Sequence, residues 1–160
     1  MLPLFAPEPK PAKAKRRTAK PKTPHPLTGT LPALDSTTGQ RAYRLTYEAR
    51  PWTLNVERQG NRWKRAGLVK EWRPAFRDLA REARMQACQS IGVTVWPEVK
   101  DGRSLPDTAA CVGAAKAAID GVTDAGVIPD DGPAHVRRLT FMAPIVSGRD
   151  ALTLDVAVLS

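Results

Sequence analysis

Four charged side chains between residues 116 and 131 are spaced so that they could act together on a charged group. Lys116 and Asp120 are four residues apart in a helix-like stretch, so they share one helix face. Such a pair is either a surface ion pair or part of a site, since most of the other positions nearby are apolar. Asp130 and Asp131 follow Pro129, and adjacent aspartates either form a turn or supply oxygen ligands to a cation such as Mg²⁺.

Asp107 is a further carboxylate, ahead of the same helix. It stands between Pro106 and Thr108, which is typical of a helix N-cap whose carboxylate accepts amide hydrogen bonds. The alternative is a ligand for a metal ion. Asp107 is nine residues before Lys116, about half a turn out of phase on an ideal helix. It can therefore reach the Lys116 side only from a cap or loop position.

Residues 50–72 mix basic and aromatic side chains, a combination that can hold backbone phosphates and stack on exposed bases. The alternative is that the tryptophans pack in the core and the arginines face solvent. Both interpretations can hold for different residues. The members of this segment are Arg50, Trp52, Arg58, Arg62, Trp63, Lys64, Arg65, Lys70 and Trp72.

The chain has 160 residues and a formal net charge of +9, and this charge is unevenly placed. Residues 1–40 hold seven Lys/Arg, two acidic residues and eight prolines, which predicts a disordered basic tail. Residues 41–160 form the second unit, long enough for one core. A strongly basic chain is attracted to polyanions, of which nucleic acid is the most abundant.

Several classes of site are disfavoured by composition. Cys88 and Cys111 are 23 residues apart, so no structural zinc site is expected, and we interpret both as small reduced core residues. His135 is the one histidine outside the tail, which argues against a histidine-centred nuclease or a Ser-His hydrolase. No apolar run approaches a membrane span, and the N-terminus is a poor signal peptide.

Hydrophobic periodicity predicts an α+β domain with a small mixed β-sheet and two main helices, in the order β-α-β-α-β-β. We expect Gly92 to stop the first helix, Pro97 to end the strand that follows, and the last two strands to form a hairpin. The expected elements are a strand at 43–47, a loop at 50–72, a helix at 73–90, a strand at 92–99, a helix at 108–122, and strands at 136–143 and 151–159.

Together these residues resemble the RusA family of Holliday junction resolvases, common in bacteriophages and prophages. The family has a D-x-D-N cluster, a helical lysine, an aspartate four residues later, Ala-Gly, and Asp-Asp at a strand entrance. This chain keeps that order from Lys116 to Asp131, with Ala-Gly at 125–126, and the resemblance covers about residues 43–159. It departs from the family where Ala109 and Ala110 replace the second aspartate and the asparagine.

The resemblance implies a Mg²⁺-dependent endonuclease that resolves four-way DNA junctions in recombination and repair as a cytoplasmic homodimer, without an organic cofactor. It implies that Asp107, Lys116 and Asp131 are catalytic, with Asp130 as a further metal ligand beside the two aspartates and Asp120 supporting the lysine. For a phage-encoded protein the compartment would be the host cytoplasm. The DNA contacts it implies are Asn55, Arg58, Arg62, Trp63, Lys64 and Arg65.

Two other functions stay open. The loss of an acid at Ala109 is compatible with a junction-binding protein of the same fold that no longer cleaves DNA. The basic tail is also compatible with a phage structural or interaction protein.

Overall fold

The computed structural model describes residues 28–34, 41–60 and 62–159. Of the predicted tail, residues 28–34 fall within this range, and the remainder of residues 1–40 lies outside it. The described part of the tail touches the sheet, because Thr28 forms a parallel bridge with Val146 and the Gly29 amide donates to the Val146 carbonyl at 3.3 Å.

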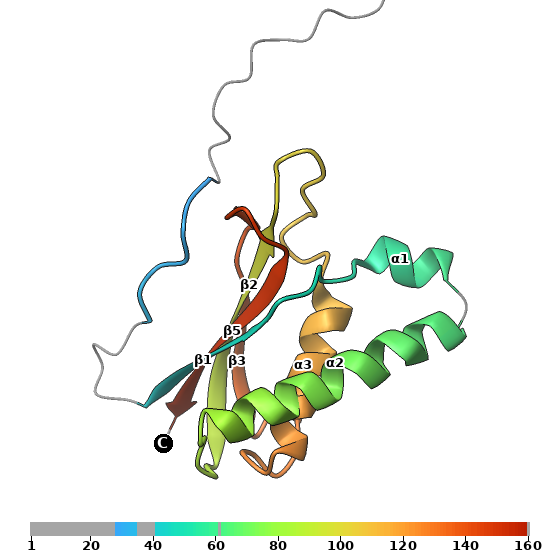
Figure 1. The fold of residues 1–160 in the computed structure, drawn as a ribbon. Helices are drawn as coiled ribbons and strands as arrows, with labels where there is room; N and C mark the ends of the chain where they lie inside the picture. Colours follow the sequence, from blue (N-terminus) through green and yellow to red (C-terminus); the bar gives the residue numbers. More distant parts are fainter. Residues whose placement is uncertain (1–27, 35–40, 61, 160) are drawn as a thin grey trace, which may run out of the picture.

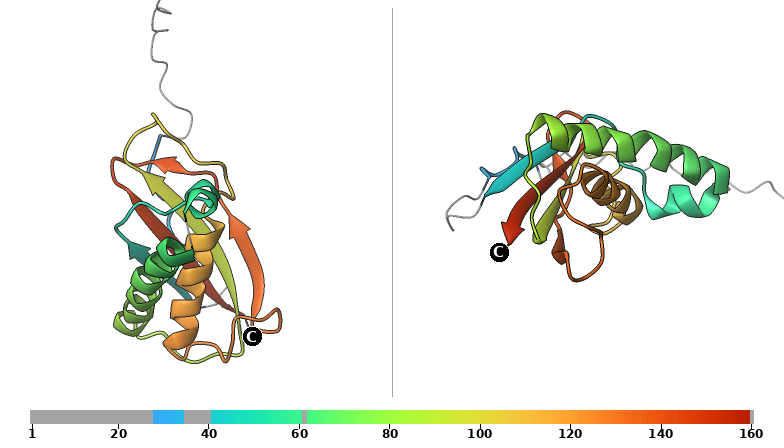
Figure 2. Two further views of the ribbon diagram at one scale, coloured as in Figure 1. Left: turned by 90° about the vertical axis from the view of Figure 1, so that its right-hand side faces the viewer. Right: turned by 90° about the horizontal axis from the view of Figure 1, so that it is seen from below.

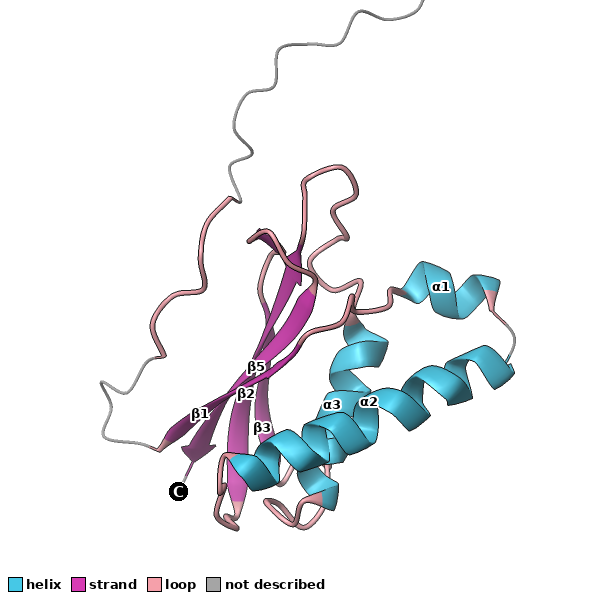
Figure 3. Cartoon of the chain, viewed as in Figure 1, coloured by secondary structure: helices cyan, strands magenta, loops and turns pink. Residues whose placement is uncertain are grey.

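A single five-stranded sheet forms one layer of the fold, with its main strands in the order β1-β5-β2-β3 (Figures 1 and 3). Strand β5 (Ala151–Leu159) is antiparallel to both β1 (Ala42–Tyr47) and β2 (Ser90–Val99). Strands β3 (Val136–Phe141) and β4 (Ile145–Val146) pair parallel with β2. The predicted α+β class with a mixed sheet is confirmed.

Helices α2 (Arg62–Glu82) and α3 (Val112–Asp124) form the second layer and cover one face of the sheet (Figure 2). The register aligns Leu45, Leu154 and Val95 across three strands, so their side chains share the covered face. Trp72 and Phe76 of α2 are fully buried against this face. The short helix α1 (Leu54–Gln59) has no buried residue and contacts the core through the partly buried Val56.

Close packing of α2 on α3 depends on a glycine. A Cβ atom at Gly121 of α3 would lie 2.3 Å from the backbone oxygen of Arg73 in α2. The core-facing side of α3 is otherwise mostly alanine, and these small side chains let the two helices approach closely. This contact fixes the position of α3, which carries Lys116 and Asp120.

The predicted loop at 50–72 is mostly helical, and the predicted helix at 73–90 both starts and ends earlier than expected. Residues 54–59 and 62–82 are helical, and α2 runs through Pro74, a residue that resembles a helix start in the sequence. The rings of Tyr47 and Trp52 lie 5.0 and 5.2 Å from that of Trp72, so aromatic packing anchors the helix just before the proline.

Helix α2 ends eight residues before the predicted position, in a Schellman-type turn. Arg84 has a φ of 52°, its amide donates to the Arg81 carbonyl at 2.9 Å, and the Met85 amide donates to the Ala80 carbonyl at 3.1 Å. Gly92 therefore plays no part in stopping the helix and lies within β2.

Two further boundaries and one connection differ from expectation. Strand β2 continues through Pro97 to Val99, and α3 starts at Val112 because residues 108–111 form turns. No hairpin joins β3 to β5, because β5 inserts between β1 and β2 while β3 lies on the far side of β2. Residues 151–154 are buried, so β5 is an interior strand with a partner on each side.

Both cysteines are free, but neither lies in a helix. Cys88 is in the segment between α2 and β2, and Cys111 immediately precedes α3. Burial raises the pKa of the Cys111 thiol to about 11, which makes it a weak nucleophile at neutral pH. Of the helices in the described ranges, none is both long and apolar enough to cross a membrane.

Candidate functional site

Lys116 is the charged centre of the site. Buried small residues occupy most of α3, so Lys116 and Asp120 are confined to the face that remains open. The Lys116 ammonium donates to Asp120 Oδ1 at 2.5 Å and also to Asp131 Oδ2. Asp131 belongs to the loop that follows α3 and leads into β3, so two separate segments supply the carboxylates.

The charge state of Lys116 follows from these contacts. Partial burial works against the ammonium charge, but the hydrogen bonds to Asp120 and Asp131 outweigh it and raise the pKa of Lys116. The contact with Lys116 lowers the pKa of Asp131. Lys116 is therefore a cation at neutral pH, suited to electrostatic stabilisation of an anion rather than to accepting a proton. Its side chain is 55% exposed, so solvent and ligands can reach it.

Asp130 makes different contacts from its neighbour Asp131. Its Oδ1 accepts a hydrogen bond from the Gly132 amide at 2.7 Å, which forms an Asx turn. Its Oδ2 lies 3.5 Å from His135 Nε2, while His135 Nδ1 lies 2.6 Å from the Gln89 carbonyl oxygen. The two adjacent aspartates therefore have different roles: Asp130 closes the turn, and Asp131 contacts Lys116.

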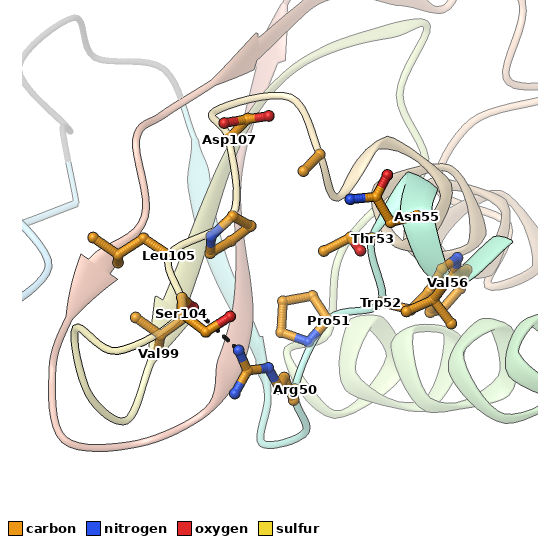
Figure 4. Close-up of a pocket in the computed structure, with 12 residues that line it drawn as sticks. Arg50, Pro51, Trp52, Thr53, Asn55, Val56, Val99, Ser104, Leu105 and Asp107 are labelled. Atoms are coloured by element: carbon orange, nitrogen blue, oxygen red, sulfur yellow. Dashed lines mark hydrogen bonds between the residues drawn. The ribbon is translucent and has the colours of Figure 1, made fainter. Parts of the chain in front are cut away.

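Asp107 lies in another hollow of the surface. A cleft of about 460 Å³ is lined both by α1 and by the segment before α3, and Asp107 and Asn55 line it from opposite walls (Figure 4). Within the described ranges neither side chain has a hydrogen bond or ion pair. Asp107 does not cap α3, because the N-cap position is Cys111.

The expected convergence of three groups is thus present in part. The structure brings Lys116 and Asp131 together and adds Asp120, but Asp107 does not join them. Among the described residues, no three His, Cys, Asp or Glu side chains come together as a metal site. Two carboxylates with water and substrate phosphate are nevertheless a common way to hold Mg²⁺, and Asp120 with Asp131 fits that mode.

A groove between α2 and α3, which we call the α2–α3 groove, leads along this site and has a volume of about 760 Å³. Its lining contains five cationic side chains and two carboxylates, so it is predominantly positive. At its inner end Arg73 makes a bidentate pair with Asp124 at 2.5 and 2.7 Å. The charged lining residues are Arg62, Arg65, Lys70, Arg73, Lys116, Asp120 and Asp124.

The predicted DNA contacts divide between two surfaces. Arg62 and Arg65 line the α2–α3 groove, whereas Asn55 and Arg58 line a second, smaller hollow next to Asp107, of about 250 Å³. Lys64 lies on the exposed side of α2.

The tryptophans of residues 50–72 also differ in their exposure. Trp52 and Trp72 are buried in the core, whereas Trp63 is 70% exposed. The core-packing interpretation is therefore confirmed for Trp52 and Trp72 and does not apply to Trp63, whose role in DNA binding stays a prediction.

Sequence reasoning missed two charged residues of this region. Glu57 of α1 accepts a hydrogen bond from Trp52 Nε1 at 2.7 Å. Its carboxylate also packs against Gly113 of α3, where an added Cβ atom would lie 1.8 Å from Glu57 Oε1. The other is Arg73 at the inner end of the groove. A glycine in the first turn of α3 was the available signal for Glu57, and nothing in the sequence marked Arg73.

In comparisons with known proteins, no family model and no curated sequence matches this chain. The resemblance to RusA-type resolvases therefore depends on the residues named above and stays a prediction.

Proposed function

We propose that this protein binds branched DNA in the α2–α3 groove and cleaves it beside Lys116, as an endonuclease acting on four-way junctions. One observation carries the proposal: an exposed, cationic Lys116 lies between two carboxylates at the wall of a positive groove. A cation next to carboxylates is suited to a phosphodiester, because the amine can bind the phosphate while the carboxylates serve water or a metal ion.

The residues of the chain would divide the work as follows. Arg62, Arg65 and Lys70 hold backbone phosphates along the groove, which is a sequence-independent, salt-sensitive interaction. Lys116 exchanges a carboxylate contact for a phosphate oxygen and stabilises the negative charge that develops there.

Asp120 and Asp131 would hold Mg²⁺, which when bound supplies charge neutralisation and a water of lowered pKa. Two symmetric cuts in a junction require two such sites, so we propose that the active species is a homodimer.

Binding without cleavage is the second candidate. It is favoured by the position of Asp107 in a separate hollow and by Ala109, which replaces an acid of the family pattern. In that case the contacts of Lys116 with Asp120 and Asp131 would serve only to position the lysine for phosphate binding.

A synthetic four-way junction, end-labelled on each strand in turn, tests these candidates when Mg²⁺ is titrated against it. We expect paired nicks with the unmodified protein and loss of nicking with Asp131→Asn, whereas the control Asp101→Asn in the 100–104 loop nicks normally. Tight junction binding without nicks at any Mg²⁺ concentration would select the binding protein. Failure to bind DNA would overturn both candidates.

Asp107→Asn adds a separate test of the same proposal. If only Asp120 and Asp131 serve the ion, Asp107→Asn retains most of the nicking. If its nicking falls as far as that of Asp131→Asn, the bound substrate must bring Asp107 to the same point.

A further inference from the structure

Trp63 is a large aromatic side chain that the fold leaves in solvent. It precedes the buried Trp72 by nine residues, which is about 2.5 helical turns, so the two rings project from opposite sides of α2. Residues 62–67 are all exposed, and this end of α2 projects beyond α3 (Figures 1 and 2). No packing requirement of the core therefore explains a tryptophan at this position.

The ring of Trp63 contacts one cationic side chain and has two more close to it in the helix. The Arg62 guanidinium carbon lies 4.9 Å from the ring centroid, a cation–π contact that covers one ring face and restrains the side chain. Lys64 follows it in the chain, and Arg65 lies one helical turn from Arg62 in the lining of the α2–α3 groove. An aromatic ring that contacts a guanidinium, with further cations nearby in the helix, fits an aromatic anion better than an apolar protein surface.

We propose that Trp63 and Arg62 form a stacking platform for one unpaired nucleobase of the DNA. This inference rests on the proposed function and deepens it, because it names the feature of branched DNA that the protein recognises. A paired base in a duplex has both faces covered by its neighbours, whereas an unstacked base at a branch point offers a free face. Stacking on tryptophan tolerates any base, so the platform reads structure rather than sequence.

The position of Arg62 connects the platform to the groove. Arg62 contacts the Trp63 ring and also lines the α2–α3 groove, whose other wall contains Lys116. A base on Trp63 therefore places its own phosphate at the groove entrance, and the adjoining strand runs along Arg65 toward Lys116. The platform thus selects which phosphates enter the site.

The experiment uses the full chain and two DNA probes of equal length: a perfect duplex and the same duplex with one unpaired 2-aminopurine. We expect Trp63→Ala to weaken binding of the second probe about 10-fold, within the range for loss of one base stack, and binding of the perfect duplex less than twofold. Trp63→Phe should retain most of the difference. Quenching of 2-aminopurine by the unmodified protein should disappear in Trp63→Ala.

Equal weakening on both probes, or no change on either, would overturn the platform. The control Trp96→Phe removes a tryptophan of β2 whose Nε1 is bonded to Asp155, and it should leave the preference intact. If the unmodified protein binds neither probe nor a junction, the proposed function fails as well. If it nicks junctions and Trp63→Ala nicks them equally well, only the platform fails.

Discussion

Lys116 and Asp131 are 15 residues apart in the chain, and folding joins them in an ion pair between α3 and the loop that enters β3. The remainder of α3 and the turn closed by Asp130 set this geometry. The pair connects α3 to the loop ahead of the edge strand β3, so the amine is held in place in the free protein. Preorganised charge of this kind is what phosphoryl chemistry requires of a protein.

Replacing Lys116 by methionine should separate binding from chemistry. The groove keeps Arg62, Arg65 and Lys70, so we expect junction affinity to fall less than about fivefold, whereas single-turnover cleavage falls about 100-fold or more, as for loss of an oxyanion donor. The matched control is Lys70→Met, which removes a cation from the same groove and should affect affinity alone. Equal effects of the two changes on the cleavage rate would contradict the assignment.

Neutralising the groove should flatten the salt dependence of DNA binding. The double variant Arg62→Gln/Arg65→Gln removes two of its cations, and each lost phosphate contact should reduce the slope of log affinity against log salt by about one. Fluorescence anisotropy with labelled duplex at several salt concentrations measures this slope. Arg103→Gln, in the exposed loop after β2, is the control that should leave it unchanged.

The basic tail makes a separable contribution. Deleting residues 1–26 removes seven Lys/Arg but keeps Thr28 and Gly29, which contact the sheet. We therefore expect the truncated protein to fold normally, to bind DNA more weakly and to show a smaller salt slope. An unchanged slope would mean that the tail does not touch phosphate.

The sequence predicts the strands better than the helices, for physical reasons. β1 and β5 have a partly or fully buried face, so their apolar patterns mark them to within one residue. β3 has no buried residue, and its predicted end at 143 lies two residues too far. The first turns of α2 contact no core, so residues 62–67 carry no apolar stripe, and Pro74 resembles a helix start. The end of α2 depends on Arg84 adopting a conformation that the identity of the residue does not reveal.

The site was predictable where it depends on local spacing. Lys116 and Asp120 lie on one face because they are four residues apart in a helix that does form. Whether Asp107 reaches Lys116 depends on the turns over 108–111 and on α1, which binds this segment through the Leu54 amide and the Ala110 carbonyl at 2.9 Å. That contact joins residues 56 apart in the chain, so no local pattern predicts it.

Two helical glycines should respond in opposite ways to alanine. Gly121→Ala places a methyl group against the Arg73 backbone, so we expect a loss of about 1–3 kcal/mol in unfolding free energy. Gly67→Ala has open space around it and should gain about 1 kcal/mol from helix propensity alone. Denaturant unfolding of both variants measures the difference, and a stabilised Gly121→Ala would show that α2 and α3 are less closely packed than described.

The end of α2 offers a stabilising change. Arg84 occupies the left-handed region at φ 52°, where a side chain is disfavoured and glycine is not. Arg84→Gly should raise the unfolding free energy by about 0.5–1 kcal/mol, provided the Schellman turn is kept. Arg81→Gly, three residues earlier inside the helix, should instead lower it by about 1 kcal/mol. If both substitutions changed the unfolding free energy in the same direction, the Schellman turn at Arg84 would be contradicted.

The ion pair of Glu98 and Arg149 should make the unfolding free energy fall at acidic pH, and Arg149→Met should reverse the direction of this pH dependence. Glu98 is 2% exposed and accepts two hydrogen bonds from Arg149, at 3.0 and 3.1 Å. Burial raises the pKa of Glu98, but the contacts with Arg149 outweigh it, so its pKa is below the usual value. Its stabilising contribution is therefore complete above about pH 4.5 and is lost as the pH falls through the lowered pKa.

Arg149→Met removes the partner and leaves burial dominant, so the pKa of Glu98 should rise above its usual value. We expect a loss of about 3 kcal/mol at pH 7, at the lower end for a broken buried pair because Thr153 still donates to Glu98 at 3.2 Å. The loss should shrink between pH 7 and pH 5 as Glu98 takes up a proton. Adding Glu98→Gln should remove this pH dependence, whereas a penalty that is constant with pH would show that the carboxylate is solvated without Arg149.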